Sequence, residues 1–444
     1  MTKTILVAGA GKSTIYLIDY LLSNAQRYKW KIIIADGNAA AISEKIMNNK
    51  HAEAAVIDIA NDIAREQLVQ RADMVISLMP AHLHILLAKD CLKHKKNLIT
   101  SSYISDEIKA MSAAVKDAGL MFMCEMGLDP GLDHMTASQI IHSIQRVAAI
   151  ITSFKSYCGG LVAPEDDDNP WHYKFSWNPR NIVTAGKAGA SYLQNGKEVD
   201  IPYKEVFLNN KKIKVEGVGS LAYYPNRDSM HYIDSYGIPE VKNFMRATLR
   251  HATFCKGWQA VIDLDLTNEQ DHFDTKGKTY ASWIKEKTGY KDGITLSQHI
   301  AQKLNLHVDD KTINMLRWLG VMEDKPLKEK KTASSADILL DLLLEKWAMQ
   351  PDEKDMVVMQ HEVEYIHRDK KITLTSSMSI NGENREHSAM AKTVGLPIAI
   401  LAKLVLTDKI NPPKGVLIPN MPSVYRPILT ELKHYGISFT EEIA

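Results

Sequence analysis

The stretch TILVAGAGKST, residues 4–14, decides how the first half of this chain folds. Its first five residues are a short apolar run typical of a buried strand, and Gly9 and Gly11 follow at once. Residues 13–22 then repeat apolar side chains at helical spacing, and a second apolar run, residues 31–35, ends at Asp36. This order of strand, glycine turn, helix, strand and acid predicts a dinucleotide-binding βαβ unit.

The glycine turn has the chemistry that a pyrophosphate requires. One glycine permits the tight turn, the next lets the backbone approach the phosphates, and the N–H groups at the start of the helix bind them. The third glycine of the usual motif is replaced by Thr14, and a P-loop is excluded because its first glycine position holds Leu6. We therefore expect cofactor contacts from Gly9, Ala10, Gly11 and Lys12.

Asp36 bears on the choice of cofactor. A carboxylate at the end of the second strand accepts hydrogen bonds from the ribose hydroxyls and repels a 2′-phosphate. Gly37 and Asn38 follow it, and neither offers the arginine that would receive such a phosphate. The sequence therefore favours NAD, with NADP as the alternative. In the other interpretation Asp36 only caps the next helix, as Asp commonly does.

Length and composition narrow the class of protein. A chain of 444 residues with 45% hydrophobic side chains suggests a globular protein of two or three domains. The net charge of +1 gives no reason to expect nucleic acid or an anionic membrane as a partner. No apolar run approaches the length of a membrane span, and a strand that begins at residue 4 leaves no room for a signal sequence. We expect a cytoplasmic protein.

Cysteines and histidines show no metal-binding pattern. The four cysteines are far apart in the chain, without a Cys-x-x-Cys pair, which indicates reduced thiols. The histidines lack ligand spacing, and we expect no metal.

Strands and helices continue to alternate up to about residue 123, which predicts a parallel sheet with helices on both faces. Ligands of such sheets bind beyond the carboxyl ends of the strands. The side chains at those ends are therefore site candidates: Asp58, Met79, Pro80, Ser101, Ser102, Tyr103 and residues 125–131.

The pattern changes after residue 131. Strand-like runs at 152–157, 211–215, 261–266, 356–365 and 372–379 predict a second α/β domain with a mixed sheet. Helical periods dominate from about 270 to 350 and predict a helical insert. Long helices are expected at 390–406 and 424–435, where the chain should return to the first domain. The predicted division is a Rossmann domain of residues 1–130 and 392–444, a substrate-binding and dimerisation domain of residues 131–268 and 352–391, and an all-helical insert of residues 269–351.

Three titratable side chains are candidates for acid–base chemistry. Asp129 lies in a turn rich in glycine and proline, residues 127–134, that joins the two domains and should line the cleft between them. It could instead open a β-turn and cap the following helix. Tyr103 and Cys158 are the other candidates, although a tyrosine after a strand and a buried cysteine are often structural.

Arginines follow in the second domain. Arg227 lies in a polar turn, and Arg246 and Arg250 are one helical turn apart in residues 244–251, which places both on one face of an expected helix. Guanidinium groups that converge on a cleft suit a substrate with several carboxylates. Ordinary salt bridges are the alternative.

At these residues the chain resembles saccharopine dehydrogenase of the glutamate-forming type. The resemblance runs in order through almost the whole chain. The matching stretches are residues 76–80, 100–105, 125–134, 154–161, 174–180, 224–229, 247–250 and 388–397.

The resemblance implies a reaction and a set of contacts. Members of the family interconvert saccharopine with L-glutamate and L-2-aminoadipate 6-semialdehyde using a nicotinamide cofactor, have three domains and are usually homodimers. Relatives favour NADP and carry an arginine after the second strand, where this chain has Asp36. The implied cofactor contacts are Gly9–Gly11, Asp58, Met79, Pro80, Ser101, Ser102, Leu128, Asp129, Pro130, Gly131 and Ser176. The implied substrate contacts are Ser102, Tyr103, Asp129, Arg227, Thr248, Leu249 and Arg250, to which we add Arg246.

Two other functions stay open. A related carboxyamine dehydrogenase or polyamine synthase would use another amine and aldehyde. A nucleotide-binding regulatory protein without catalysis would bind NAD and turn nothing over.

Overall fold

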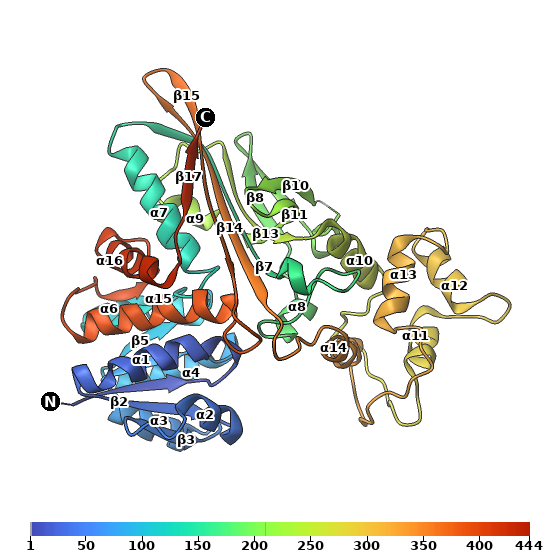
Figure 1. Cartoon of the computed structure of the whole chain (residues 1–444), viewed down its shortest axis with the longest axis horizontal. Helices are drawn as coiled ribbons and strands as arrows, with labels where there is room; N and C mark the ends of the chain where they lie inside the picture. Colours follow the sequence, from blue (N-terminus) through green and yellow to red (C-terminus); the bar gives the residue numbers. More distant parts are fainter. Residues whose placement is uncertain (1, 209) are drawn as a thin grey trace.

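The computed structural model describes residues 2–208 and 210–444. Its first sheet has seven strands, all parallel, with the glycine turn at the end of β1, an inner strand next to the central β4 (Figure 1). The strands lie in the order β16 (Gly415–Leu417), β6 (Met121–Met123), β5 (Asn97–Thr100), β4 (Met74–Ser77), β1 (Lys3–Ala8), β2 (Trp30–Asp36) and β3 (Ala52–Val56). The predicted Rossmann-like parallel sheet is therefore confirmed.

Helices cover both faces of this sheet because its strands are apolar on both sides. One face packs against α1 (Ile15–Tyr28), α15 (Ala389–Leu406) and α16 (Pro422–Leu432), and the other against α3 (Asp62–Arg71), α4 (His84–Lys93), α5 (Asp106–Ala110) and α6 (Ser112–Asp117). The short helices η1 (Lys12–Thr14), α2 (Ala39–Ile46), η2 (Ala81–Leu83) and η5 (Lys433–Tyr435) complete this part.

Helix α15 passes a length and composition test for a membrane span, yet 78% of that segment is buried in the protein. It lies against α1 at close range: a Cβ on Gly395 would come within 2.9 Å of the Leu17 backbone nitrogen. The apolar character of α15 is therefore that of a helix in the core.

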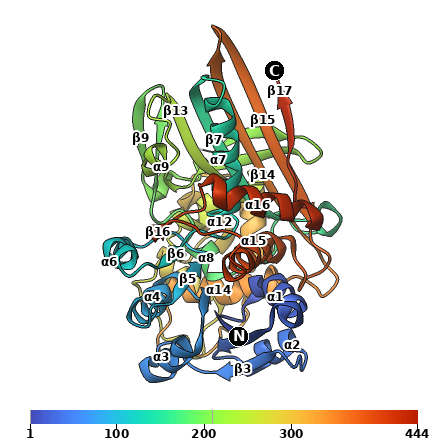
Figure 2. The ribbon, with the colours of Figure 1, turned by 90° about the vertical axis from the view of Figure 1, so that its left-hand side faces the viewer.

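The second sheet has ten strands and is mixed. It lies beside the parallel sheet and extends away from it (Figures 1 and 2). Its main order is β10 (Lys211–Val215), β11 (Gly219–Pro225), β13 (Asn243–Arg250), β7 (Ile150–Val162), β14 (Asp355–His367), β15 (Lys370–Asn381) and β17 (Thr440–Ile443). The strands β8 (Ala190–Gln194), β9 (Lys197–Ile201) and β12 (Arg227–Asp228) attach beside β13. Strand β13 is parallel to β7, and β14 is antiparallel to it. Helix α7 (Leu132–Gln145) connects the two sheets, and η3 (Pro164–Asp166), α8 (Arg180–Val183), η4 (Tyr203–Glu205) and α9 (His231–Ser235) lie in the connections.

The helical insert is present and has its own aromatic core. It consists of α11 (Tyr280–Thr288), α12 (Leu296–Lys303), α13 (Lys311–Leu319) and α14 (Ser335–Lys346), packed against α10 (Ala252–Asp263). Capping boxes start α11, α12 and α14, and glycines in the left-handed conformation end α11 and α13. Trp171, Trp258, Trp283 and Trp347 are fully buried in this core, so the insert shares it with α10 and with the loop around Trp171.

Three sequence expectations are wrong. Residues 261–266 are not a strand, because Phe254, Trp258 and Val261 follow helical spacing and α10 ends at Asp263. Residues 244–251 are not a helix but mostly strand β13. The end of the chain does not stay with the first domain, because β17 pairs with β15 of the second sheet.

Candidate functional site

The connection between β6 and α7 is a tight loop that only glycines can form. Gly127 N–H donates to the Pro130 carbonyl at 2.9 Å, and Leu132 N–H donates to the Gly127 carbonyl at 2.9 Å. Gly131 has φ +146°, and a Cβ there would lie 2.1 Å from the Gly127 carbonyl oxygen. The loop therefore holds Asp129 in a fixed position between the two sheets.

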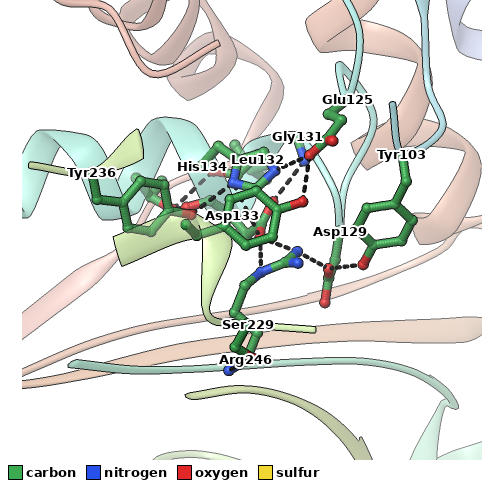
Figure 3. Close-up of polar contacts among 12 residues, drawn as sticks. Tyr103, Glu125, Asp129, Gly131, Leu132, Asp133, His134, Ser229, Tyr236 and Arg246 are labelled. Atoms are coloured by element: carbon green, nitrogen blue, oxygen red, sulfur yellow. Dashed lines mark hydrogen bonds and ion pairs between the residues drawn. The ribbon is translucent and has the colours of Figure 1, made fainter. Parts of the chain in front are cut away.

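Asp129 is joined to the second sheet through Arg246. The Arg246 guanidinium lies with Nη2 2.5 Å from Asp129 Oδ1 and 2.7 Å from Asp133 Oδ2 (Figure 3). Burial raises the pKa of Asp129 to about 6, and the Asp133 charge adds to that rise while Arg246 opposes it. Asp133 also accepts the Gly131 N–H at 2.6 Å, and its pKa is lowered by its cationic neighbours.

Tyr103 completes this cluster from the end of β5. Its hydroxyl donates to Asp129 Oδ1 at 3.2 Å. The guanidinium carbons of Arg227 and Arg246 lie 5.1 and 5.5 Å from the centre of its ring. Burial raises the pKa of Tyr103 well above its ordinary value, so the phenol keeps its proton at neutral pH.

A second buried network supports the loop from behind. His134 Nε2 is 2.8 Å from Glu125 Oε2, which also accepts the Tyr232 hydroxyl at 2.7 Å. The other Glu125 oxygen accepts the Ile104 N–H at 3.1 Å, and His134 Nδ1 bonds the Tyr236 hydroxyl at 2.7 Å. These contacts tie the start of α7 to the segment that carries Tyr103.

Three of the predicted substrate residues share one face of the second sheet. Arg246, Thr248 and Arg250 alternate along β13, and the sheet register places Thr248 beside Cys158 on β7. Asp129, Asp133, Arg246 and Arg250 all influence the Cys158 thiol, whose pKa burial raises well above its ordinary value. The thiol therefore stays protonated. Arg246 Nη1 and Arg250 Nε are buried without a partner among the described residues.

Residues 244–251 form mostly strand β13 and not the predicted helix, but the conclusion that Arg246 and Arg250 share one face still holds. Residues four apart share a face in a strand as well as in a helix, so Arg246 and Arg250 do lie on one side. Leu249 points to the opposite face, where it packs with Tyr157 and Ala247. Arg246 also confirms the alternative interpretation, that the arginines form ordinary salt bridges, because its Nη2 and Nε bind Asp129 and Asp133.

The residues of the glycine turn fit a dinucleotide. Gly9 has φ +105°, and a Cβ there would lie 3.0 Å from the Leu78 carbonyl oxygen, whereas a Cβ on Gly11 would meet nothing within 4 Å. The turn is therefore tight at Gly9 and open at Gly11, where a phosphate would approach. Asp36 Oδ2 accepts the Ala10 N–H at 2.7 Å, and it is Asn38 that caps the next helix.

The other predicted cofactor residues occupy different surroundings. Met79, Ser101, Ser102 and Leu128 lie beyond the ends of β4, β5 and β6, and Pro80 is exposed next to them. Asp58 is exposed and accepts the Ala60 N–H at 2.8 Å. Ser176 is buried and bonds Asp355, although the neighbouring Phe175 carbonyl lies 3.5 Å from Lys12 Nζ.

Sequence reasoning assigned no role to Ser77, His84, Asp133 or His134, and it included Glu125 only among the candidates at the ends of the strands. Glu125, Asp133 and His134 belong to a stretch that was singled out, and the alternation of acids with a histidine beside Asp129 was the available signal. The histidines, His84 among them, were considered only as possible metal ligands. The one group of metal-ligating atoms within 4.8 Å among the described residues is Asp167, His172 and His251, where a hydrogen bond of 2.6 Å already joins Asp167 to His172.

Two family models match consecutive parts of the chain. The saccharopine dehydrogenase NADP binding domain matches residues 5–123, and the saccharopine dehydrogenase C-terminal domain matches residues 127–437. The chain belongs to the saccharopine dehydrogenase family. The resemblance seen in the sequence is thus confirmed.

Similar proteins of known name support the assignment of this chain to the saccharopine dehydrogenase family. The chain is 32% identical to a saccharopine dehydrogenase [NADP(+), L-glutamate-forming] of Pyricularia oryzae, across 100% of this chain and 99% of that one. It is 38% identical to the bovine mitochondrial alpha-aminoadipic semialdehyde synthase, across 84% of this chain and 41% of that longer one. The structure of apo saccharopine dehydrogenase (L-Glu forming) from Saccharomyces cerevisiae matches with a TM-score of 0.87 at 31% identity, covering 100% of both chains.

Proposed function

We propose that this protein interconverts saccharopine with L-2-aminoadipate 6-semialdehyde and L-glutamate, using a nicotinamide dinucleotide, in lysine metabolism. The observation that carries the proposal is the pair of buried arginines on β13. Arg246 Nη1 and Arg250 Nε lack partners in the described structure, and a buried donor without a partner costs about 1–3 kcal/mol. A substrate with several carboxylates would satisfy such donors, and saccharopine has three.

The acid–base groups suit the oxidation of a secondary amine. The dinucleotide, held by the glycine turn and Asp36, supplies hydride acceptance when bound. Asp129, with its pKa raised to about 6, would take the proton from the substrate nitrogen before hydride leaves the adjacent carbon. Once that first proton has passed to solvent, Asp129 would take a proton from the water that adds to the resulting imine and return it to nitrogen. Loss of the hydroxyl proton of the carbinolamine would then release glutamate and the aldehyde.

Tyr103, Arg227 and Cys158 have supporting roles in this proposal. Tyr103 keeps its proton and would donate a hydrogen bond to the substrate or to Asp129. Arg227 is exposed at the edge of the same cluster, and we assign it to a substrate carboxylate. Cys158 would contribute as a neutral thiol.

We infer that NAD is preferred over NADP. Asp36 offers a carboxylate where a 2′-phosphate would sit, with Gly37 and Asn38 after it. The fungal L-glutamate-forming relatives are named for NADP(+), so this preference would set the chain apart from them.

The two proposals are tested together by following absorbance of the reduced nicotinamide with purified protein and saccharopine, with NAD and NADP in parallel. Reduction of NAD well above NADP supports both. Reduction of NADP alone keeps the reaction and removes the argument from Asp36. No reduction of either would turn attention to other carboxyamines, and tight NAD binding without any turnover would favour a regulatory protein.

We also propose a homodimer formed through the second sheet. Ile150 and Ile366 are 49% and 40% exposed, and they pair across β7 and β14 at its far end. Exposed aliphatic side chains grouped on a sheet suit a subunit contact. Light scattering on the wild type and on Ile366→Lys tests it: the substitution should yield monomer.

A further inference from the structure

A buried chain of hydrogen bonds runs from the core of the first sheet to the cleft. Ser77 Oγ, at the end of β4, lies 2.7 Å from His84 Nδ1, and His84 Nε2 lies 2.9 Å from Ser102 Oγ. Ser77 is 0% exposed and His84 is 2% exposed, whereas Ser102 is half-buried just beyond β5. His84 therefore links a serine sealed in the core to one at the edge of the cofactor cleft.

The imidazole in the middle of this chain is neutral. Burial and the nearby His82 lower the pKa of His84 to about 4. The ring also stands at the first residue of α4, where the helix dipole opposes a positive charge. A neutral imidazole has one N–H donor and one acceptor nitrogen, so the chain of hydrogen bonds has a direction.

The sealed end sets that direction. Among the described residues, the Ser77 hydroxyl bonds only His84. If Nδ1 carried the hydrogen, the Ser77 hydroxyl hydrogen would be buried without an acceptor, at a cost of about 1–3 kcal/mol. Ser77 therefore donates to Nδ1, and Nε2–H donates to Ser102. Because the chain ends in the core, it offers no path for a proton to solvent.

Ser102 is also held by its backbone. Its carbonyl accepts the Glu125 N–H at 3.1 Å, which fixes it beside the segment that leads to Asp129. With Oγ accepting from His84, its own hydroxyl hydrogen is directed away from the ring.

We propose that His84 is a positioning residue that makes Ser102 a hydrogen-bond donor into the cleft, toward an acceptor oxygen of the bound ligand. The inference rests on the proposed function in one respect, namely that a dinucleotide and a carboxylate substrate occupy this cleft. The acceptor oxygen belongs either to the dinucleotide or to the substrate, and the two are separated by measurement.

A double-mutant cycle on the full-length protein tests the proposal. His84→Ala, Ser102→Ala and the double variant are compared in dinucleotide Kd, measured by fluorescence, and in KM and kcat with saccharopine. Each single variant should weaken one of these two ligands by about five- to tenfold, the worth of one hydrogen bond. The double variant should be no worse than Ser102→Ala, because His84 acts only through Ser102. An effect on Kd would assign the acceptor to the dinucleotide, and an effect on KM alone to the substrate.

Further variants separate positioning from folding. His84→Gln places an amide N–H near the position of Nε2 and should recover most of the loss. His82→Ala, an exposed histidine of the same segment, should change nothing. The proposal would be overturned if the double variant showed the product of the two single-variant losses in both dinucleotide Kd and KM. It would also be overturned if His84→Gln were as impaired as His84→Ala while both kept the melting temperature of the wild type.

If the His84 variants fail to fold, the cycle is run with Ser77→Ala and Ser102→Ala. The double variant should again be no worse than Ser102→Ala, and losses that multiply would overturn the proposal. If wild-type protein binds dinucleotide but does not oxidise saccharopine, the proposed function fails. The Kd cycle then decides the positioning role by itself.

Discussion

Arg246 Nη2 lies 2.5 Å from Asp129 Oδ1, although the two residues are 117 positions apart in the chain. The contact joins the loop after the first sheet to the central part of the second. It makes one arginine serve the fold and the site together, because the same guanidinium pairs with both carboxylates while its Nη1 has no partner among the described residues.

Replacing Arg246 should be costly for folding. Arg246→Leu would leave Asp129 and Asp133 buried without their cation, and we expect a loss of about 3–5 kcal/mol in the free energy of unfolding. Urea denaturation measures it. The exposed Arg227→Leu is the matched control and should change stability by less than about 0.5 kcal/mol while raising KM for saccharopine. Equal stability of the two variants would contradict this account.

Asp129 should govern the acid limb of saccharopine oxidation. The carboxylate must be ionised to accept a proton, and its pKa is raised to about 6, so kcat/KM should fall as the pH drops through about 6. Asp129→Ala should be slowed by about 10²-fold and lose that limb, with orientation and electrostatics sustaining the remaining rate. Complete inactivity of a folded Asp129→Ala protein would show that we underestimate this residue.

The raised pKa of Asp129 also makes the free energy of unfolding depend on pH. A carboxyl whose pKa is higher in the folded than in the unfolded chain binds its proton more tightly when folded. Its contribution to stability is therefore full below about pH 4, the unfolded value, and is lost as the pH rises to about 6. Denaturation at several pH values should show a flatter profile for Asp129→Asn than for wild type between these limits.

Asp36 should discriminate between the two dinucleotides by its charge. Asp36→Asn keeps an oxygen that can accept the Ala10 N–H but removes the negative charge. We expect NADP binding to improve by about tenfold relative to NAD, because repulsion of the 2′-phosphate is removed. Asp36→Ala, which also loses the bond to Ala10, should weaken both dinucleotides. An unchanged Kd ratio in the Asn variant would place the selectivity elsewhere.

Gly131 should tolerate no side chain. A Cβ would collide with the Gly127 backbone at 2.1 Å, and φ is +146°, so Gly131→Ala should destabilise the protein by more than about 2 kcal/mol and displace Asp129. Gly277→Ala provides the control: φ is +67° there, but a Cβ meets nothing within 4 Å, and about 1 kcal/mol is expected. Thermal unfolding compares them, and similar losses would mean that the loop can relax.

Most of the expectations that rested on local pattern agree with the structure. The first strand, the glycine turn, the parallel sheet and the helical insert all follow from residues close together in the chain, where side-chain periodicity and glycine sterics act. The errors arose where local pattern is ambiguous. Residues 244–251 suit a helix or a buried strand equally, and it is pairing with β7 and β11 that makes them a strand.

The sequence by itself determined the residue types of the site and the turn that presents the cofactor. The tertiary structure decided which of those residues bind other protein groups and which can face a ligand. It directed Arg246 to Asp129 and Asp133, turned Leu249 away from the cleft, and connected Ser102 to His84. The physical reason is that hydrogen-bond partners, burial and protonation depend on groups far apart in the chain, and these become neighbours only when the two sheets have packed together.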